Sequence, residues 1–238
     1  MKTALLTLAL AAASLAAAAQ SQPAAAAAPA ASAAPADAYT AMLAATIAEQ
    51  NAAGPAALPA NVAKLERAAS ARPADWLPRY YQARAYLKMG FSAQGDDLKD
   101  QNFDYAQAAL DQAKKLAGLN QAEVLVLQAY IYQGRIMVSP MTRGMVYAGR
   151  VSEALEMARK LDPTNPRVYL VLANDLYYRP AMFGGGPDKA KPLYEKAAAL
   201  FATFKPAGPL SPNWGEGNAT ARLTEINAEL ASSAAATK

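Results

Sequence analysis

The sequence predicts an all-α fold built from antiparallel helix pairs, and three observations lead to it. The chain is rich in Ala and Leu, with only 13 Gly in 238 residues, and Ala is the best intrinsic helix former. Apolar residues recur at helical spacing along most of the chain. A sequence pattern also repeats at a period of about 44 residues, which is typical of stacked helical units.

The first helix of each unit carries the clearest repeat. Residues 81–86, 125–130 and 169–174 lie 44 positions apart, and each segment has a large residue followed four positions later by Ala. Gly90 and Gly134 follow the first two segments at the same offset. Three successive units are therefore expected, and the recurring Ala marks a position where neighbouring helices approach closely.

The second helix of each unit repeats as well. Residues 106–116, 151–161 and 190–197 each carry an apolar residue and an Ala seven positions apart, which places both on one face of a helix. An earlier copy occupies residues 62–69. The sequence thus predicts about four helix pairs.

One further helix is expected at each end of the repeats. Asp37 suits an N-cap, and the stripe that follows it comprises Tyr39, Met42, Leu43, Thr46 and Ile47. After residues 212–215, a second stripe comprises Leu223, Ile226 and Leu230. Terminal repeats expose an apolar face that must be covered, so both helices are predicted to act as caps.

The repeat resembles the tetratricopeptide-repeat (TPR) family. The matching residues are Ala85, Tyr86 and Gly90, then Ala129, Tyr130 and Gly134, then Ala190, Tyr194 and Ala197, and the closing turn Leu161-Asp162-Pro163. The resemblance covers roughly residues 60–205. It departs from the family at Leu127 and Val171, where small residues are expected, and in a unit about ten residues longer than the family's 34.

The resemblance implies an α-solenoid whose concave face is lined by the first helices. The candidate groove-lining residues are Tyr81, Tyr86, Tyr130 and Tyr169. Such a face implies a protein or peptide partner, and an exported bacterial protein is the expected setting.

The N-terminus has the layout of a secretory signal peptide. Lys2 precedes a short apolar run, and Ala-x-Ala cleavage sites follow near residue 19. We predict a signal peptide at 1–19, a disordered Ala/Pro linker at 20–36, the repeat domain at 37–231 and a disordered tail at 232–238. The mature chain is expected to be periplasmic or secreted, without a membrane span; the alternative for the first residues is a low-complexity Ala segment.

Composition argues against catalysis and nucleic-acid binding. The chain has no His and no Cys, which removes His- and Cys-based nucleophilic and metal sites. No catalytic residue, metal site or cofactor is therefore predicted, and the chain is expected not to be an enzyme. The formal net charge is +4, but acidic and basic residues alternate without a basic stripe, so nucleic acid is not an expected partner.

The extra residues of each unit fall within the turn of the helix pair, at 91–101, 137–149 and 179–187. Equivalent turns of a solenoid project from one edge, so these inserts could frame a binding site. The candidate binding residues are Arg143, Tyr147, Tyr178, Arg179 and Phe183, because Arg with aromatic residues is the usual make-up of a binding hot spot. The alternatives are neutral loop growth and Tyr residues that simply pack in the core.

Two functions follow from this sequence. The first is a non-enzymatic periplasmic or envelope module that holds a protein or peptide partner of unknown identity. The alternative is a periplasmic small-ligand-binding accessory protein of a solute-uptake system, which uses the loop-lined edge. An open groove several turns long would favour the first, and an enclosed pocket with convergent polar groups would favour the second.

Overall fold

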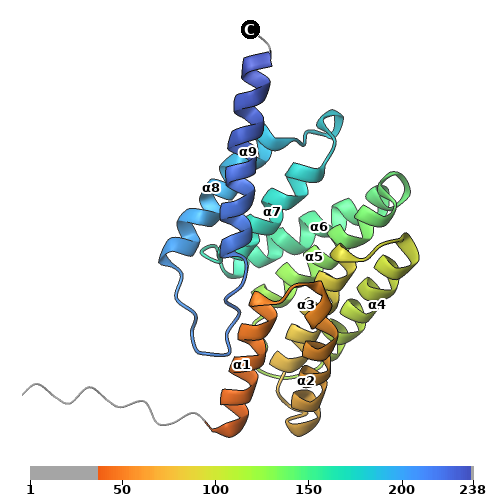
Figure 1. Ribbon diagram of the computed structural model, residues 1–238, viewed down its shortest axis with the longest axis vertical. Helices are drawn as coiled ribbons and strands as arrows, with labels where there is room; N and C mark the ends of the chain where they lie inside the picture. Colours follow the sequence, from red (N-terminus) through yellow and green to blue (C-terminus); the bar gives the residue numbers. More distant parts are fainter. Residues whose placement is uncertain (1–36, 237–238) are drawn as a thin grey trace, which may run out of the picture. The chain divides into compact units, whose positions relative to one another are not determined.

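The structure, a computed structural model, describes residues 37–236, and all regular structure in this range is helical (Figure 1). The predicted all-α fold is confirmed. Its helices are α1 (Ala38–Ala52), α2 (Leu58–Ala71), α3 (Leu77–Ser92), α4 (Asp96–Ala113), α5 (Gln121–Val138), α6 (Pro140–Leu161), α7 (Pro166–Tyr178), α8 (Pro187–Thr203) and α9 (Glu216–Ala236), with short 3-10 turns η1 (Pro55–Ala57) and η2 (Ala181–Phe183). The predicted signal peptide and linker lie outside the described residues, and α9 continues past residue 231.

Several helices begin where the sequence supplies a capping side chain. Asp37 accepts a hydrogen bond from the Thr40 backbone N–H at 2.8 Å, as expected for the N-cap of α1. The side chains of Asn120 and Asn165 cap α5 and α7 in the same way. These local contacts fix where the helices begin and therefore which residues face the core.

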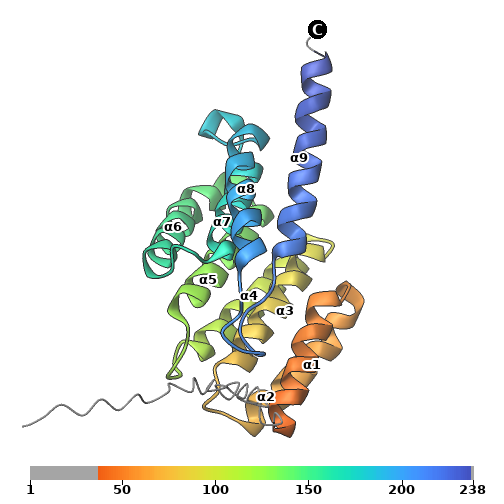
Figure 2. The ribbon, with the colours of Figure 1, turned by 90° about the vertical axis from the view of Figure 1, so that its left-hand side faces the viewer.

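Consecutive helices pack as pairs, with α3 against α4, α5 against α6, and α7 against α8. The first helices also contact one another in order, α1 with α3, α3 with α5, and α5 with α7. We call these four helices the first-helix row. At the C-terminal end, α9 packs against α8 (Figure 2).

The core lies between these helices, and the recurring alanines lie inside it. Ala85, Ala129 and Ala173 are all completely buried, as the repeat register predicts. Phe103 of α4 shows why two glycines repeat: a Cβ atom at Gly90 or at Gly134 would come closer than 3.0 Å to the Phe103 ring. The two glycines thus let one aromatic ring pack against both α3 and α5.

The expectation of three long loops is wrong for two of the inserts. Residues 93–95 alone separate α3 from α4, and Ser139 alone separates α5 from α6. The extra residues lengthen the helices, because acidic residues favour the start of α4 and Pro140 is tolerated at the first position of α6. Only the segment between α7 and α8 forms a loop, which contains η2. The three turns nevertheless lie along one edge (Figure 1).

Within residues 37–236, no helix has the length and apolar character needed to cross a membrane.

Candidate functional site

Residues 204–215, which we call the strap, connect α8 to α9 without regular structure and run beside α1 and α3 (Figure 1). Asn213 of the strap accepts a hydrogen bond from Asn51 of α1 at 2.8 Å. The Leu210 carbonyl accepts one from the Tyr81 hydroxyl of α3 at 3.1 Å. The strap therefore covers the face that the sequence assigned to a groove.

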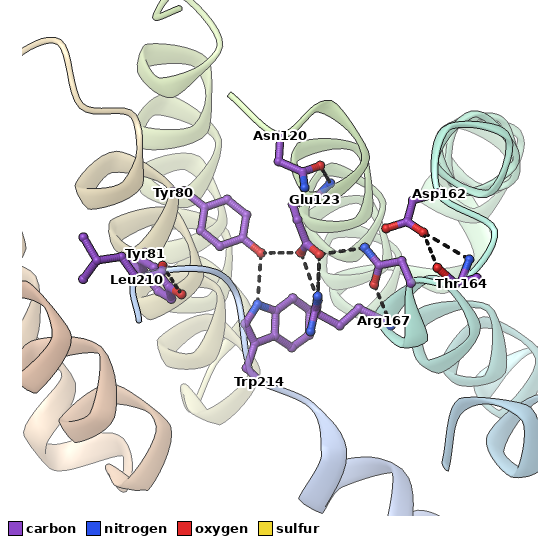
Figure 3. A network of polar contacts seen from close by, with 10 residues as sticks. Tyr80, Tyr81, Asn120, Glu123, Asp162, Thr164, Arg167, Leu210 and Trp214 are labelled. Atoms are coloured by element: carbon purple, nitrogen blue, oxygen red, sulfur yellow. Dashed lines mark hydrogen bonds and ion pairs between the residues drawn. The ribbon is translucent and has the colours of Figure 1, made fainter. Parts of the chain in front are cut away.

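Trp214 anchors the strap among residues of α3, α5 and α7. Its side chain is buried, and its indole N–H donates to the Tyr80 hydroxyl at 3.0 Å (Figure 3). Its ring lies nearly parallel to that of Tyr130, with centroids 6.3 Å apart and an interplanar angle of 18°. The indole is thus held by a stacked ring on one side and a hydrogen bond at its edge.

Behind Trp214 lies a buried ion pair between Glu123 of α5 and Arg167 of α7 (Figure 3). Arg167 donates from Nη2 to Glu123 Oε1 at 2.6 Å, and Asn165 donates to the same oxygen at 2.6 Å. The Tyr80 hydroxyl donates to the other oxygen, Oε2, at 3.1 Å. Burial, and then the nearby carboxylate, raise the pKa of Tyr80 well above its usual value, so this hydroxyl stays protonated and remains a donor.

A second buried guanidinium, that of Arg84 on α3, lies near the same indole. Its Cζ atom is 5.1 Å from the centroid of the Trp214 ring, and that of Arg167 is 5.8 Å away. Arg84 donates to the Gln50 side chain at 2.6 Å but forms no ion pair within residues 37–236. Burial lowers the pKa of Arg84 to about 10, which still leaves it charged at neutral pH.

The polar network is incomplete at one further atom. Arg167 Nη1 is buried and has no hydrogen-bond partner in the part of the chain that the structure describes. Among the described residues this region thus holds two buried guanidiniums, those of Arg84 and Arg167, but one buried carboxylate, that of Glu123, which pairs with Arg167. The region beneath the strap carries an excess positive charge, which favours an anion.

The four predicted groove tyrosines divide into two pairs. Tyr81 is buried beneath the strap, and Tyr130 stacks on Trp214. Tyr86 instead lies against Tyr105 of α4, with ring centroids 5.2 Å apart. Tyr169 donates its hydroxyl to the Pro163 carbonyl at 2.9 Å and has Lys196 above its ring. The structure brings only the first pair to the strap.

The two predicted arginines at the edge both form ion pairs. Arg143 of α6 pairs with Asp100 of α4 through two hydrogen bonds, and this contact lowers the pKa of Asp100. Arg179 pairs with Asp175 one turn earlier on α7. Burial raises the pKa of Asp175, and Arg179 opposes that shift. Both arginines therefore have intramolecular partners that join or stabilise helices.

The three predicted aromatic residues at the edge differ in exposure. Tyr147 is half-buried against Tyr132, with ring centroids 5.5 Å apart. Tyr178 is exposed and accepts a hydrogen bond from Arg222 at 2.6 Å. Phe183 is 61% exposed, so its ring is available for contact with another molecule.

Sequence reasoning missed the methionines at the same edge. Met141 is 84% exposed, Met145 is 90% exposed and Met182 is 83% exposed. Met141 and Met145 lie four residues apart and so share one face of α6. We use the term methionine edge for Met141, Met145, Val146, Tyr178, Met182 and Phe183, all of which are exposed. The spacing of Met141 and Met145 within the second insert was the available signal, and exposed large apolar residues are candidates for contact with another molecule.

The hollow between α1 and α2 and the acidic side chains of the described residues are weaker candidates for a binding site. A hollow of about 390 Å³ between α1 and α2 is lined mostly by Ala side chains, with Glu49, Asn61 and Lys64. Within residues 37–236 no group of three Asp or Glu side chains lies close enough to hold a metal ion. The strap region and the methionine edge therefore remain the two candidate sites.

Comparison with known proteins finds a similar solved structure. No protein-family model matches the sequence, and no curated protein matches it. The structure is similar to that of the HusA haemophore from Porphyromonas gingivalis, with a TM-score of 0.72, 30% sequence identity, and coverage of 81% of this chain and 94% of that chain. The chain belongs to the HusA family. HusA is named as a haemophore.

Proposed function

We propose that this chain is an exported, non-catalytic protein that binds haem or a related tetrapyrrole at the methionine edge. The observation that carries the proposal is membership of the HusA family, since HusA is a haemophore. In this proposal the exposed methionines and Phe183 together contact the flat, apolar faces of the macrocycle. Arg150, exposed above the Tyr147 ring, is the cation proposed for its carboxylates, whereas Arg222 beside Tyr178 already pairs with Glu225.

Composition restricts how the iron could be held. Haem iron in proteins is usually ligated by His, Cys, Met or Tyr, and this chain has no His or Cys. At the methionine edge, Met141, Met145 and Met182 offer exposed thioethers, and Tyr178 offers an exposed phenol. Because apolar contact supplies most of the affinity in this proposal, metal-free protoporphyrin should bind within about tenfold of haemin.

The experiment is a titration of the full chain with haemin and with protoporphyrin IX, followed by absorbance and by quenching of Trp emission. The double variant Met141→Ala/Met145→Ala and the single variant Phe183→Ala should each weaken binding by about tenfold or more. Met157→Ala is the matched control, because Met157 is also exposed on α6 but lies more than three turns from Met145. Wild-type affinity in the edge variants, or no binding by the wild-type chain, would refute the proposal.

A protein or peptide partner is the second candidate. The same methionines favour it, because exposed Met side chains adapt to varied apolar partners. The helix pairs also support the finer description of the fold as a tetratricopeptide-like solenoid. Cross-linking the mature chain in its native envelope tests this candidate. A partner lost in Met141→Ala/Met145→Ala, together with no tetrapyrrole binding, would favour it.

Export is part of the proposal. The charged start, short apolar run and Ala-x-Ala sites of the sequence support a cleavable signal peptide at 1–19. N-terminal sequencing of the exported chain should begin between Gln20 and Gln22. An exported chain that retains Met1 would contradict this part of the proposal.

A further inference from the structure

Trp214 occupies a position built to hold a flat aromatic ring. The ring comes from the strap, whereas the groups around it come from α3, α5 and α7. Tyr130 stacks on it, the Tyr80 hydroxyl accepts its N–H, and the guanidiniums of Arg84 and Arg167 each lie within 6 Å of its centroid. Stacking, a polar contact at the edge and two cations are the elements of a site for a planar anion.

The charges around Trp214 are not balanced by the protein. Glu123 pairs with Arg167, while Arg84 forms no ion pair in the described part of the chain and still is almost completely buried. Arg167 also keeps one buried N–H group, at Nη1, without a hydrogen-bond partner. A buried charge without a counter-ion destabilises the fold, and a carboxylate brought by a ligand would neutralise Arg84 and use the free donor.

The strap that carries Trp214 is held to the first-helix row by few polar contacts. These are the hydrogen bonds of Trp214 to Tyr80, of Leu210 to Tyr81 and of Asn213 to Asn51. Most of the strap before Leu210 is exposed. Gly215, with φ of 110°, joins the strap to α9 in a conformation that favours glycine. Lifting the strap would break these three hydrogen bonds and the ring contacts of Phe204 and Trp214 with Arg167, whereas the packing of α8 against α9 lies outside the strap.

We propose that the strap covers a second binding site, which takes a planar aromatic molecule bearing a carboxylate. The ligand's ring replaces the Trp214 indole against Tyr130 and Tyr80, and its carboxylate pairs with Arg84 and with Nη1 of Arg167. This site is separate from the methionine edge, and it does not depend on the tetrapyrrole proposal.

The probe is indole-3-acetate, which combines the ring of Trp214 with a carboxylate. The full chain contains only two Trp residues, Trp76 and Trp214, so ¹⁵N-indole labelling gives two assignable N–H signals in an NMR spectrum. Titration should move the Trp214 signal to the position of a solvent-exposed indole and leave Trp76 in place. 3-Methylindole, a neutral analogue without the carboxylate, should bind at least about tenfold more weakly, because it lacks the charge-assisted hydrogen bonds.

Substitution of Arg84 tests the cation directly. Arg84→Gln and Arg84→Met should both remove the preference for indole-3-acetate over 3-methylindole. Arg67→Gln, at an exposed Arg of α2 without an ion pair in the described range, should keep it. The proposal is overturned if the Trp214 signal stays in place throughout the wild-type titration, if 3-methylindole moves it equally, or if folded Arg84 variants bind like the wild type. If neither Arg84 variant folds, the comparison of indole-3-acetate with 3-methylindole on the wild-type chain alone decides the proposal.

Discussion

The indole N–H of Trp214 donates to the hydroxyl of Tyr80, a residue 134 positions earlier in the chain. That hydroxyl in turn donates to Glu123, which holds Arg167 (Figure 3). One phenol thus joins the strap to α3, α5 and α7. The stability of the strap and that of the buried ion pair are therefore coupled.

Tyr80→Phe should lower the free energy of unfolding by about 1–3 kcal/mol, because it leaves the buried indole N–H without its acceptor and removes one of the two hydrogen bonds to Glu123 Oε2. Urea denaturation followed by far-UV circular dichroism measures this change. Tyr105→Phe is the control, since Tyr105 is nearly half exposed, and it should change stability by less than about 0.5 kcal/mol. Equal effects of the two substitutions would show that the hydroxyl of Tyr80 contributes nothing.

Gly134, one of the two glycines that face the Phe103 ring, gives a second prediction. Gly134→Ala should destabilise the chain by about 1–3 kcal/mol, because the added methyl group overlaps a ring that is packed on all sides. Gly144→Ala is the matched control: Gly144 is also helical, but a Cβ atom there meets nothing within 4 Å. That substitution should stabilise α6 by about 0.5–1 kcal/mol. Thermal or urea unfolding should show a loss of stability for Gly134→Ala and a gain for Gly144→Ala.

Much of the fold could be predicted because the repeat is local and regular. The spacing of Ala85, Ala129 and Ala173 located the first helices, and all three residues are buried. The lengths of the turns could not be predicted as well. The inserts contain residues that either continue a helix or start a new one, as Pro140 does, and periodicity alone does not separate these outcomes from a loop.

The candidate site was harder to predict than the fold. Arg143 and Arg179 are at the predicted edge, but only the structure shows that each has an acidic partner. Trp214 lies in a segment without periodicity, and nothing in the sequence links it to Tyr80. The sequence offered two signals of a buried polar site, Glu123 and Arg84. Each is a charged residue with apolar neighbours in a predicted helix. Contacts between residues so far apart in the chain depend on how the helices stack.

The two residues at the end of the edge should differ in their effect on folding. Phe183→Ala should change the free energy of unfolding by less than about 1 kcal/mol, because the ring is mostly exposed. Arg179→Ala should cost about 1–2 kcal/mol, because the mostly buried Asp175 carboxylate would lose its partner. Thermal melts of both variants check this order. A large loss for Phe183→Ala would make that ring part of the core and not of a binding surface.

The ion pair between Asp100 and Arg143 should give a stability contribution that depends on pH. The hydrogen bonds from Arg143 lower the pKa of Asp100 in the folded chain, so the unfolded chain binds this proton more readily. The contribution is therefore present above the unfolded pKa of about 3.9 and is lost as the pH falls through the lower folded value. Arg143→Gln should cost about 0.5–1 kcal/mol at neutral pH, and urea midpoints should show this gap closing as the pH falls below the unfolded pKa of Asp100. A gap independent of pH would show that Arg143 acts through packing alone.

The two buried arginines beneath the strap should respond in opposite directions to the same substitution. Burial lowers the pKa of Arg84 to about 10, so at neutral pH the folded chain carries the full cost of its desolvated charge. This cost falls only above about pH 10, because the folded chain then releases the Arg84 proton at a lower pH than the unfolded chain does. Arg84→Met should therefore raise the free energy of unfolding at pH 7 by about 1–3 kcal/mol, even though it loses the contact with Trp214.

Arg167→Met should lower the free energy of unfolding by about 3–5 kcal/mol, because the Glu123 carboxylate would remain buried without its counter-ion. Urea denaturation of both variants at pH 7 makes the comparison. A loss of stability in Arg84→Met as well would mean that the fold itself requires Arg84, and the need for a ligand carboxylate to offset its charge would disappear.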